Sequence, residues 1–320
     1  MKNGSGVAVV IPAYKPELNA FERLSLNTCA RVLHRYPRVL VAPAGLSFDT
    51  YREKHPDIDV ETFDPRFFAS TAAYSELLLS PDFYARFERY EYILIYQLDC
   101  LVFRDALTEW CRGGYDYLGA PWFGEIIEGL LNFYKPWWRR GPLPNAGGNG
   151  GLSLRHVGAS LRVLSLRGSA ARRWGRLYED VFWGVYVPSK FPWFRIADQK
   201  TCARFAIQTE PDACLELTGG EVPFGCHAWF KRDLAFWLEL VAAHDLVPGD
   251  ELFELVLEPL TSQVRVVRDA IDRQLPDLGA WATALRNGQR RSDPPATTDV
   301  NRALQLLQFA ASTQLTAPWP

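Results

Sequence analysis

The stretch Tyr92-Ile93-Leu94-Ile95-Tyr96-Gln97-Leu98-Asp99 is the clearest strand in the sequence. Its apolar residues follow one another without alternation, as they do in a parallel strand that is covered on both faces. The run ends on a carboxylate, and ligands of open α/β sheets bind beyond the carboxyl ends of the strands. We therefore expect Asp99 to face a binding crevice, although an Asp in this place is often only a turn or helix-cap residue.

Segments before this strand extend the same pattern. The sequence predicts strands at Val7–Ile11 and Val39–Ala42, and helices at Leu18–Leu33 and Ala72–Phe87. Apolar runs that alternate with amphipathic stretches are typical of parallel strands joined by crossover helices. The expected fold class is therefore α/β, with a Rossmann-type, doubly wound, mostly parallel sheet.

The length of 320 residues is about the ceiling for a single hydrophobic core. From about Asp233 onward the pattern of apolar residues is helical. We expect one large domain over residues 1–245 and a helical C-terminal extension over residues 246–320.

Charge and composition exclude several classes of protein. A net charge of -2 and a pI near 6.2 provide no basic field for binding nucleic acid through its phosphates. The longest apolar runs fall short of the roughly 20 residues of a membrane span, and the start does not resemble a signal peptide. The six cysteines include no C-x-x-C pair, which argues against a zinc ribbon or a disulfide scaffold. We expect a cytoplasmic protein.

Three further features carry candidate functional residues. The glycine-rich run Gly147–Gly151 would let backbone approach a ligand closely, but it matches neither a P-loop nor a dinucleotide fingerprint, and a flexible hairpin tip explains it equally well. The pair Glu179-Asp180 precedes an aromatic segment, where a partly desolvated carboxylate becomes a better general base. The alternative is an acidic first turn that complements a helix dipole. His227, flanked by glycine and aromatic residues, is significant only in combination with the others.

A loop of rings and cations over residues 133–140 includes Trp137 and Trp138. The sequence favours an acceptor-binding loop or a contact with an anionic membrane surface. The other interpretation is a loop that packs on the domain with its arginines in solvent.

In combination and in this order, the motifs resemble GT-A-type nucleotide-sugar glycosyltransferases. The closest resemblance is to a family of predicted transferases catalogued only as a domain of unknown function, and it covers roughly residues 7–230. The motifs that carry it are Phe83-Tyr84, residues 90–99, residues 116–122, residues 148–155, Glu179-Asp180-Val181-Phe182 and residues 223–229.

The resemblance implies a reaction and assigns the residues to roles. A sugar would pass from a nucleoside-diphosphate donor, with UDP favoured, to a hydroxyl of a glycan or glycolipid, with inversion, in surface polysaccharide or glycoconjugate synthesis. Asp180 would be the base, with Glu179 as its substitute. The residues implied to bind the donor are Pro12, Ala13, Tyr14, Lys15, Gln97, Asp99, Gly148, Asn149, Gly150, Gly151 and Arg155, and those implied to bind the acceptor are Trp122, Trp137, Trp138 and Trp183. For Arg155, pairing with phosphate and orienting Asp180 both remain open.

The resemblance also implies a metal ion, Mn2+ or Mg2+, held by Asp99 and His227. The metal-binding D-x-D motif of GT-A enzymes reads Gln97-Leu98-Asp99 here, so an amide replaces the first carboxylate. Hard oxygen ligands suit both ions, but with one carboxylate the ion would arrive with the donor, and metal independence stays open. An alternative function is a catalytically inactive module that binds nucleotide sugars or glycans. A nucleotidyltransferase is disfavoured, because the turn at Pro12-Ala13-Tyr14-Lys15 lacks a glycine-rich basic loop.

Overall fold

The computed structural model describes residues 6–123, 148–175 and 178–231, together with isolated positions from 236 to 247. The chain divides into two compact units: residues 1–18 with 25–232, and residues 19–24 with 233–320. The predicted domain boundary at residue 245 stays a prediction. Apart from positions 246 and 247, the predicted extension lies outside the described residues. Within the described part, no helix is both long and apolar enough to cross a membrane.

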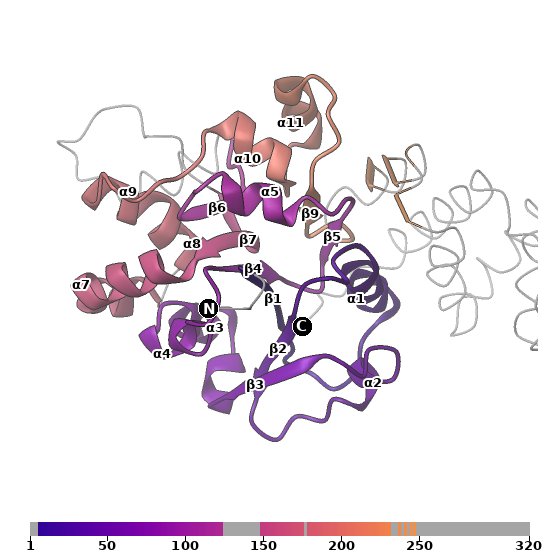
Figure 1. Cartoon of the computed structure of the whole chain (residues 1–320), viewed down its shortest axis with the longest axis horizontal. Helices are drawn as coiled ribbons and strands as arrows, with labels where there is room; N and C mark the ends of the chain where they lie inside the picture. Colours follow the sequence, from indigo (N-terminus) through magenta and orange to yellow (C-terminus); the bar gives the residue numbers. More distant parts are fainter. Residues whose placement is uncertain are drawn as a thin grey trace, which may run out of the picture. The chain divides into compact units, whose positions relative to one another are not determined.

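A six-stranded sheet in the order β3-β2-β1-β4-β7-β6 forms the centre of the first unit (Figure 1). Strands β3, β2, β1 and β4 pair in parallel, and β7 is antiparallel to both β4 and β6. The predicted α/β class with a mostly parallel sheet is confirmed. The strands are β1 Val7–Pro12, β2 Arg38–Pro43, β3 Asp59–Phe63, β4 Tyr92–Tyr96, β6 Tyr117–Ala120 and β7 Asn149–His156.

Alternate residues of the buried strands face two separate hydrophobic clusters. In β1, Val7, Val9 and Ile11 belong to one cluster, whereas Ala8 and Val10 belong to the other. Because successive side chains of a strand point to opposite faces, the sheet is covered on both sides. Continuous apolar runs such as β1 and β4 are the consequence.

The helices form the two outer layers (Figure 1). Residues from the C-terminal half of α1 belong to the first cluster, and residues of α3, α4 and α7 belong to the second. The helical segments are α1 Ala20–Val32, α2 Asp49–Arg52, η1 Pro65–Phe68, α3 Thr71–Leu78, α4 Pro81–Ala85, α5 Leu107–Arg112, α7 Val157–Gly175, α8 Glu179–Val181, η2 Phe182–Tyr186, α9 Val187–Lys190, α10 Gln199–Phe205 and α11 Pro211–Thr218.

The predicted helix at Ala72–Phe87 is two helices, α3 and α4. Pro81 at the start of α4 cannot donate a hydrogen bond to a preceding turn, so α3 ends before it. The Ser80 hydroxyl accepts a hydrogen bond from the Asp82 amide at 3.1 Å and caps the new helix.

A second, three-stranded sheet in the order β5-β9-β8 joins segments far apart in the chain. It consists of β5 Cys100–Val102, β8 Ala206–Ile207 and β9 Gly225–His227. Strands of two or three residues have too little periodicity to be found in a sequence. This small sheet brings β9 next to the end of β4.

A fully buried arginine ties β7 to α8. Arg155 is 0% exposed, and its Nη2 donates to Oε1 of Glu179 at 2.9 Å while Nη1 lies 2.9 Å from Oε2. Its Nε donates to Ser153 Oγ at 3.0 Å, and its guanidinium lies 5.4 Å from the centre of the Tyr117 ring. A buried charge is costly unless it has such partners.

Removing this cation leaves the Glu179 carboxylate buried and unpaired. Arg155→Met is therefore expected to lower the free energy of unfolding by about 3–5 kcal/mol. Urea denaturation checks this, with Arg86→Met as control, because the pair of Arg86 with Glu61 at 3.1 Å is partly exposed and is expected to contribute about 1 kcal/mol or less. Equal losses in the two variants would contradict the role given to Arg155.

Candidate functional site

The candidate site lies at the carboxyl edge of the parallel strands, where the chain order reverses. From β1 the sheet extends to β2 and β3 on one side and to β4 on the other, and ligands of open α/β sheets bind at such a switch point. Because β7 runs against β4, its first residues lie at the same edge. The backbone amide of Gln97 donates to the Gly151 carbonyl at 3.0 Å, which joins the residue after β4 to the first half of β7.

Asp99 is buried between two cationic or polar partners. Its Oδ1 lies 3.3 Å from His227 Nε2, and its Oδ2 lies 2.9 Å from the Lys231 ammonium. His227 Nε2 is also 3.2 Å from Oε1 of Gln97. Burial alone would raise the pKa of Asp99, but the charges of His227 and Lys231 hold that pKa well below its ordinary value. The Asp99 side chain is therefore a carboxylate at neutral pH.

The small sheet explains how His227 reaches Asp99. In the pairing of β5 with β9, His227 lies opposite Cys100, the residue after Asp99. The two residues are far apart in the sequence, so no local spacing indicates the contact. The predicted association of Asp99 with His227 is thus a property of the β5–β9 register.

The glycines of β7 allow two side chains to approach its backbone. A Cβ on Gly151 would overlap the imidazole of His227, and one on Gly150 would overlap the Glu179 carboxylate and lie 3.3 Å from Cβ of Asp180. Any larger residue would push these groups away. The register of β7 with β6 also shifts here, because Gly119 pairs with Ser153 but Ala120 pairs with Asn149. The predicted loop Gly147–Gly151 is therefore, from Asn149 on, a bulged strand end.

Asp180 lies on the other flank of the glycine pair from His227. Successive residues of a strand face opposite sides, and Gly150 contacts Asp180 whereas Gly151 contacts His227. The side-chain amide of Asn149 donates to Asp180 Oδ2 at 3.2 Å and ties this carboxyl group to the start of β7. The structure thus places Asp99 in contact with His227. Asp180 lies beside Gly150, and His227 lies beside the next residue, Gly151.

The two neighbouring carboxylates differ in what they can do. Loss of hydration raises the pKa of Asp180 to about 7, and the charge of Glu179 adds to this shift. A carboxyl group that titrates near neutral pH is suited to accept a proton. Glu179 is bound to Arg155, so it is a poor substitute base. Both residues also open the helix α8, as the dipole interpretation predicted.

The ligand set for a metal ion consists of Asp99, Cys100 and His227, whose ligand atoms lie within 4.8 Å of one another. The carboxylate of Asp99 and the imidazole of His227 suit a divalent ion. Cys100 does not, because burial raises the pKa of its thiol and the sulfur donates to the Gly151 carbonyl at 3.3 Å. An ion on Oδ2 of Asp99 would have to displace the ammonium of Lys231. The site therefore fits an ion on Asp99 and His227 once Lys231 has moved.

The turn after β1 presents two residues at this edge. Pro12 and Ala13 are buried, whereas Tyr14 is 57% exposed and Lys15 is half-buried. The Lys15 ammonium lies 5.9 Å from the centre of the Tyr14 ring. Of the predicted donor contacts in this turn, Tyr14 and Lys15 are the ones with accessible side chains.

Several predicted contacts are buried. Arg155 pairs with Glu179, so of its two proposed roles the structure favours support of the Asp180 segment over phosphate binding. Gly148 is buried, with its carbonyl accepting from the Tyr117 hydroxyl at 2.9 Å. Trp183, 1% exposed, stacks on Phe194 at 6.0 Å, so the expectation that its ring contacts an acceptor does not agree with its place in the core.

Trp122 is buried at 5% exposure and presents little surface to an acceptor. Trp137 and Trp138 lie outside the described residues. Sequence reasoning missed Lys231, which carries no motif, and Tyr178, which directly precedes the acidic pair and is 54% exposed. The signal that could have identified Lys231 is its spacing of four residues from His227. That spacing brings both side chains to Asp99 only because the chain turns between them.

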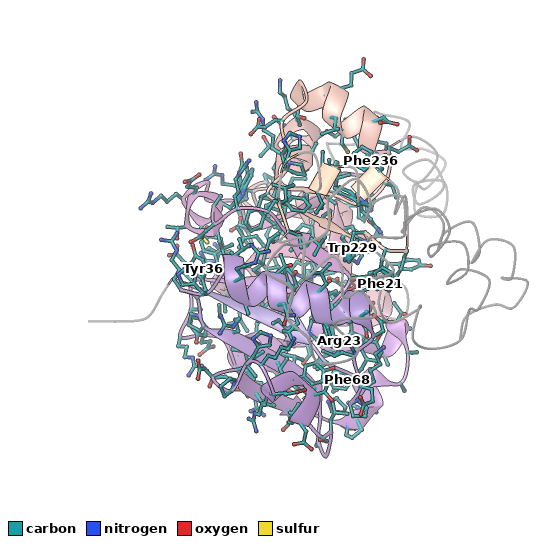
Figure 2. All side chains as sticks on the ribbon, turned by 90° about the vertical axis from the view of Figure 1, so that its right-hand side faces the viewer. Phe21, Arg23, Tyr36, Phe68, Trp229 and Phe236 are labelled. Carbon is teal, nitrogen blue, oxygen red and sulfur yellow. The ribbon has the colours of Figure 1, made fainter. Side chains whose placement is uncertain are left out.

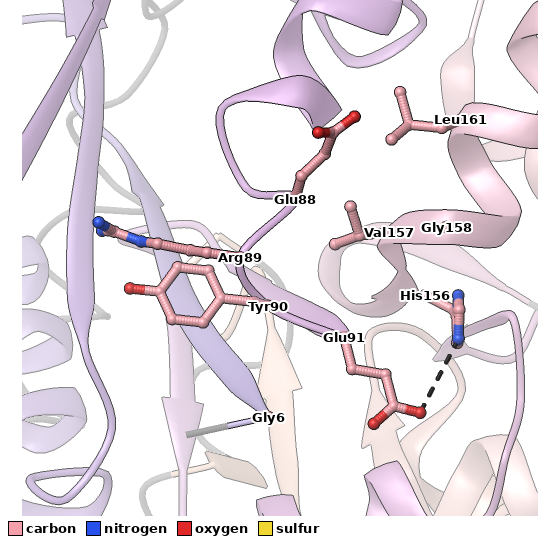
Figure 3. A pocket seen from close by; sticks show the side chains of 9 residues that line it. All are labelled: Gly6, Glu88, Arg89, Tyr90, Glu91, His156, Val157, Gly158 and Leu161. Atoms are coloured by element: carbon pink, nitrogen blue, oxygen red, sulfur yellow. Dashed lines mark ion pairs between the residues drawn. The ribbon is translucent and has the colours of Figure 1, made fainter. Parts of the chain in front are cut away.

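A pocket of about 650 Å³ lies at the opposite edge of the sheet (Figure 3). It is lined by Gly6 before β1, Glu91 before β4 and His156 at the end of β7, and His156 Nε2 is 3.9 Å from Oε1 of Glu91. These residues lie at the amino ends of the parallel strands, so they do not belong to the candidate site.

Residues 57–227 match the family described as Protein of unknown function (DUF5672). The chain belongs to this family. The matched region extends from just before β3 to His227 and therefore contains Asp99, Asp180 and His227, but not Lys231. No curated protein matches the chain.

Solved structures with a similar chain path are described as glycosyltransferases. Mouse xyloside xylosyltransferase 1 is 13% identical, with a TM-score of 0.46 over 69% of this chain and 96% of that one. The galactosyltransferase LgtC is 14% identical, with a TM-score of 0.45 over 69% and 86%. A mannosyltransferase from Pyrobaculum calidifontis, in complex with GDP-Man and Mn2+, is 14% identical, with a TM-score of 0.34 over 98% and 82%. TM-scores below 0.5 at such identities carry no activity over to this chain.

The contact between Gly151 and His227 makes a prediction for stability. Gly151→Ala is expected to lower the free energy of unfolding by about 1–3 kcal/mol, because its methyl group would displace the imidazole from a packed position. Thermal or urea denaturation measures the loss, and the NMR signals of His227 are expected to shift. Gly168→Ala in α7 is the control, since its Cβ would lie 3.7 Å from Arg172 Nη1. A Gly151 variant as stable as this control would contradict the close approach.

Proposed function

We propose that the protein is a glycosyltransferase that moves a sugar from a nucleoside-diphosphate donor, a UDP-sugar in our first choice, to a hydroxyl group. The observation that carries the proposal is that two groups of charged residues lie on the two sides of Gly150-Gly151, at one edge of the sheet. On one side of Gly150-Gly151 lies a cation-binding cluster of Asp99, His227 and Lys231, and on the other lies Asp180 with a pKa of about 7. Sugar transfer needs a positive charge for the leaving diphosphate and a base for the acceptor.

The diphosphate would lie on the side of Asp99, beyond the end of β4. When the bond between the anomeric carbon and the diphosphate oxygen breaks, the electron pair and negative charge stay on the diphosphate. A divalent ion on Asp99 and His227, Mn2+ or Mg2+, would stabilise that charge when bound. The Lys15 side chain and the exposed ring of Tyr14 would contact the nucleotide from the turn after β1.

The acceptor would approach from the side of Asp180. Its hydroxyl oxygen forms the new bond to the anomeric carbon, and its proton passes to an oxygen of the Asp180 carboxylate. Attack from the face opposite the leaving group inverts the anomeric configuration. Asn149 holds the Asp180 carboxyl group at 3.2 Å, and the pair of Glu179 with Arg155 holds the helix start that carries it. Tyr178, 54% exposed, offers an aromatic surface for a sugar ring beside the base.

The acceptor class and the cellular role extend the same proposal. A glycan or glycolipid acceptor in surface polysaccharide or glycoconjugate synthesis, used in the cytoplasm or at the inner face of the membrane, follows from the family resemblance of the motifs. Pocket shape set by loop residues decides the sugar and the linkage.

Asp180→Asn is the direct test of the base. We expect turnover to fall by about 10²–10⁴-fold while nucleotide binding persists, because the amide keeps the shape but cannot accept the proton. The rate of the unaltered protein is expected to rise with pH through about 7, as the Asp180 carboxyl group loses its proton, and the variant is expected to lack this step. Donor hydrolysis and transfer across a panel of activated sugars measure both.

Unchanged turnover in Asp180→Asn would remove this residue from the role. Saturable nucleotide binding by the unaltered protein, with neither hydrolysis nor transfer for any donor in the panel, would favour the inactive binding module instead. A thermal-shift screen gives the binding readout, since a ligand at 100 times its dissociation constant stabilises a protein by about 2.7 kcal/mol.

Chelation tests the metal ion. We expect EDTA to lower turnover and added Mn2+ or Mg2+ to restore it, because a single protein carboxylate holds the ion weakly. The matched measurement is the same assay on Asp99→Asn, which is expected to need a higher ion concentration. Full activity in the presence of EDTA would show that the proposed metal role of Asp99 and His227 is wrong.

A further inference from the structure

Lys231 is the strongest feature of the site that the sequence motifs do not include. Its ammonium lies 2.9 Å from Oδ2 of Asp99, a side chain that is only 7% exposed, whereas the Lys231 side chain is 59% exposed. One end of this contact is thus fixed in the interior, and the other belongs to a long side chain at the surface. A small rotation of the Lys231 side chain would expose the Asp99 oxygen and present the ammonium to a ligand.

The backbone around Lys231 is held firmly. Ala228 has a positive φ of 57°, which costs a non-glycine residue roughly 1 kcal/mol or more, and the Lys231 amide donates to the Ala228 carbonyl at 3.0 Å. Trp229, labelled in Figure 2, is 1% exposed and donates from Nε1 to Ser25 Oγ of α1 at 3.2 Å. The strained turn and the buried ring fix where the Lys231 side chain starts, four residues after His227.

The charge of the site demands a cation where the diphosphate would lie. The Asp99 carboxylate is buried with its Oδ2 2.9 Å from the Lys231 ammonium, and because like charges repel, a diphosphate beside this carboxylate needs a positive group between them. Lys231 already supplies a positive group at this carboxylate, and a flexible ammonium is a common ligand for phosphate oxygens. A divalent ion on the Asp99 carboxylate would lie close to the same ammonium and be repelled by it.

We propose that Lys231 binds the diphosphate of the donor, moving its ammonium from Oδ2 of Asp99 to the phosphate oxygens and so releasing that carboxylate for a divalent ion. In the absence of a ligand, Lys231 then competes with the ion for Asp99. This inference rests on the proposed function and adds to it a residue that contacts the donor and sets the order in which cations engage Asp99.

The test measures binding without turnover. UDP, inorganic pyrophosphate and uridine are titrated calorimetrically into the full chain, in EDTA, for the unaltered protein and for Lys231→Ala. We expect the variant to bind UDP and pyrophosphate about 10- to 100-fold more weakly, and uridine equally well, because only the charged hydrogen bond is lost. A second titration with Mn2+ alone is expected to show about two- to fivefold tighter binding by the variant, because Asp99 has lost a competing cation.

Two further variants keep the test decisive. Lys231→Arg retains the charge and is expected to bind pyrophosphate within a few-fold of the unaltered protein. Lys190→Ala, at the end of α9, removes an exposed lysine whose ammonium lies 6.0 Å from the Tyr186 ring and is expected to change none of the affinities.

The possible outcomes separate this inference from the proposed function. If the unaltered protein binds UDP and Lys231→Ala binds it equally well, Lys231 is not a diphosphate ligand and the proposed function stands. An unchanged Mn2+ affinity in Lys231→Ala would overturn the competition for Asp99. If the unaltered protein binds neither UDP nor any other nucleoside diphosphate, the proposed function fails, and the role of Lys231 fails with it.

Discussion

The buried ion pair of Arg155 with Glu179 is the interaction on which the site depends. It joins the interior of β7 to the first residue of α8, and Arg155 also donates to Ser153 Oγ beside the bulged strand end. Two opposite charges without access to water are stable only when each is fully satisfied, so neither element can shift alone. Asp180 follows Glu179 directly, and the position of its carboxyl group is therefore a consequence of this pair.

The second constraint is the close contact between β7 and the side chains that flank it. Gly150 and Gly151 leave no room for a Cβ. The Glu179 carboxylate, the Arg155 guanidinium and Cβ of Asp180 fill the space at Gly150, and the imidazole of His227 fills it at Gly151. The backbone of β7 therefore separates the acidic pair from His227. A substrate that spans this edge would meet a cation cluster at one end and a proton acceptor at the other, which is the division of labour that transfer of a sugar from a diphosphate requires.

The third constraint is the charge arrangement at Asp99. With His227 on one oxygen and Lys231 on the other, the buried carboxylate is balanced by side chains of the chain itself. Gln97, at the place of the first carboxylate of a D-x-D motif, contributes an uncharged oxygen 3.2 Å from His227 Nε2.

Local sequence determined the α/β class and the strands around β1, β2 and β4, because apolar periodicity and turn residues act over a few neighbours. The combination of motifs, and the family that they resemble, selected Asp99, Asp180 and His227 as candidate residues. The sequence also indicated glycines that approach other groups closely. It did not reveal the break at Pro81, the strand that begins at Asn149, the three short strands of the second sheet or the role of Lys231. Those features depend on contacts between distant segments. His227 meets Asp99 only through the β5–β9 register, and Arg155 becomes a partner of Glu179 only when both lose water in the same interior. The partner of a buried charge and the free-energy cost of burying it both depend on the groups around it. Only the tertiary structure decides which groups those are.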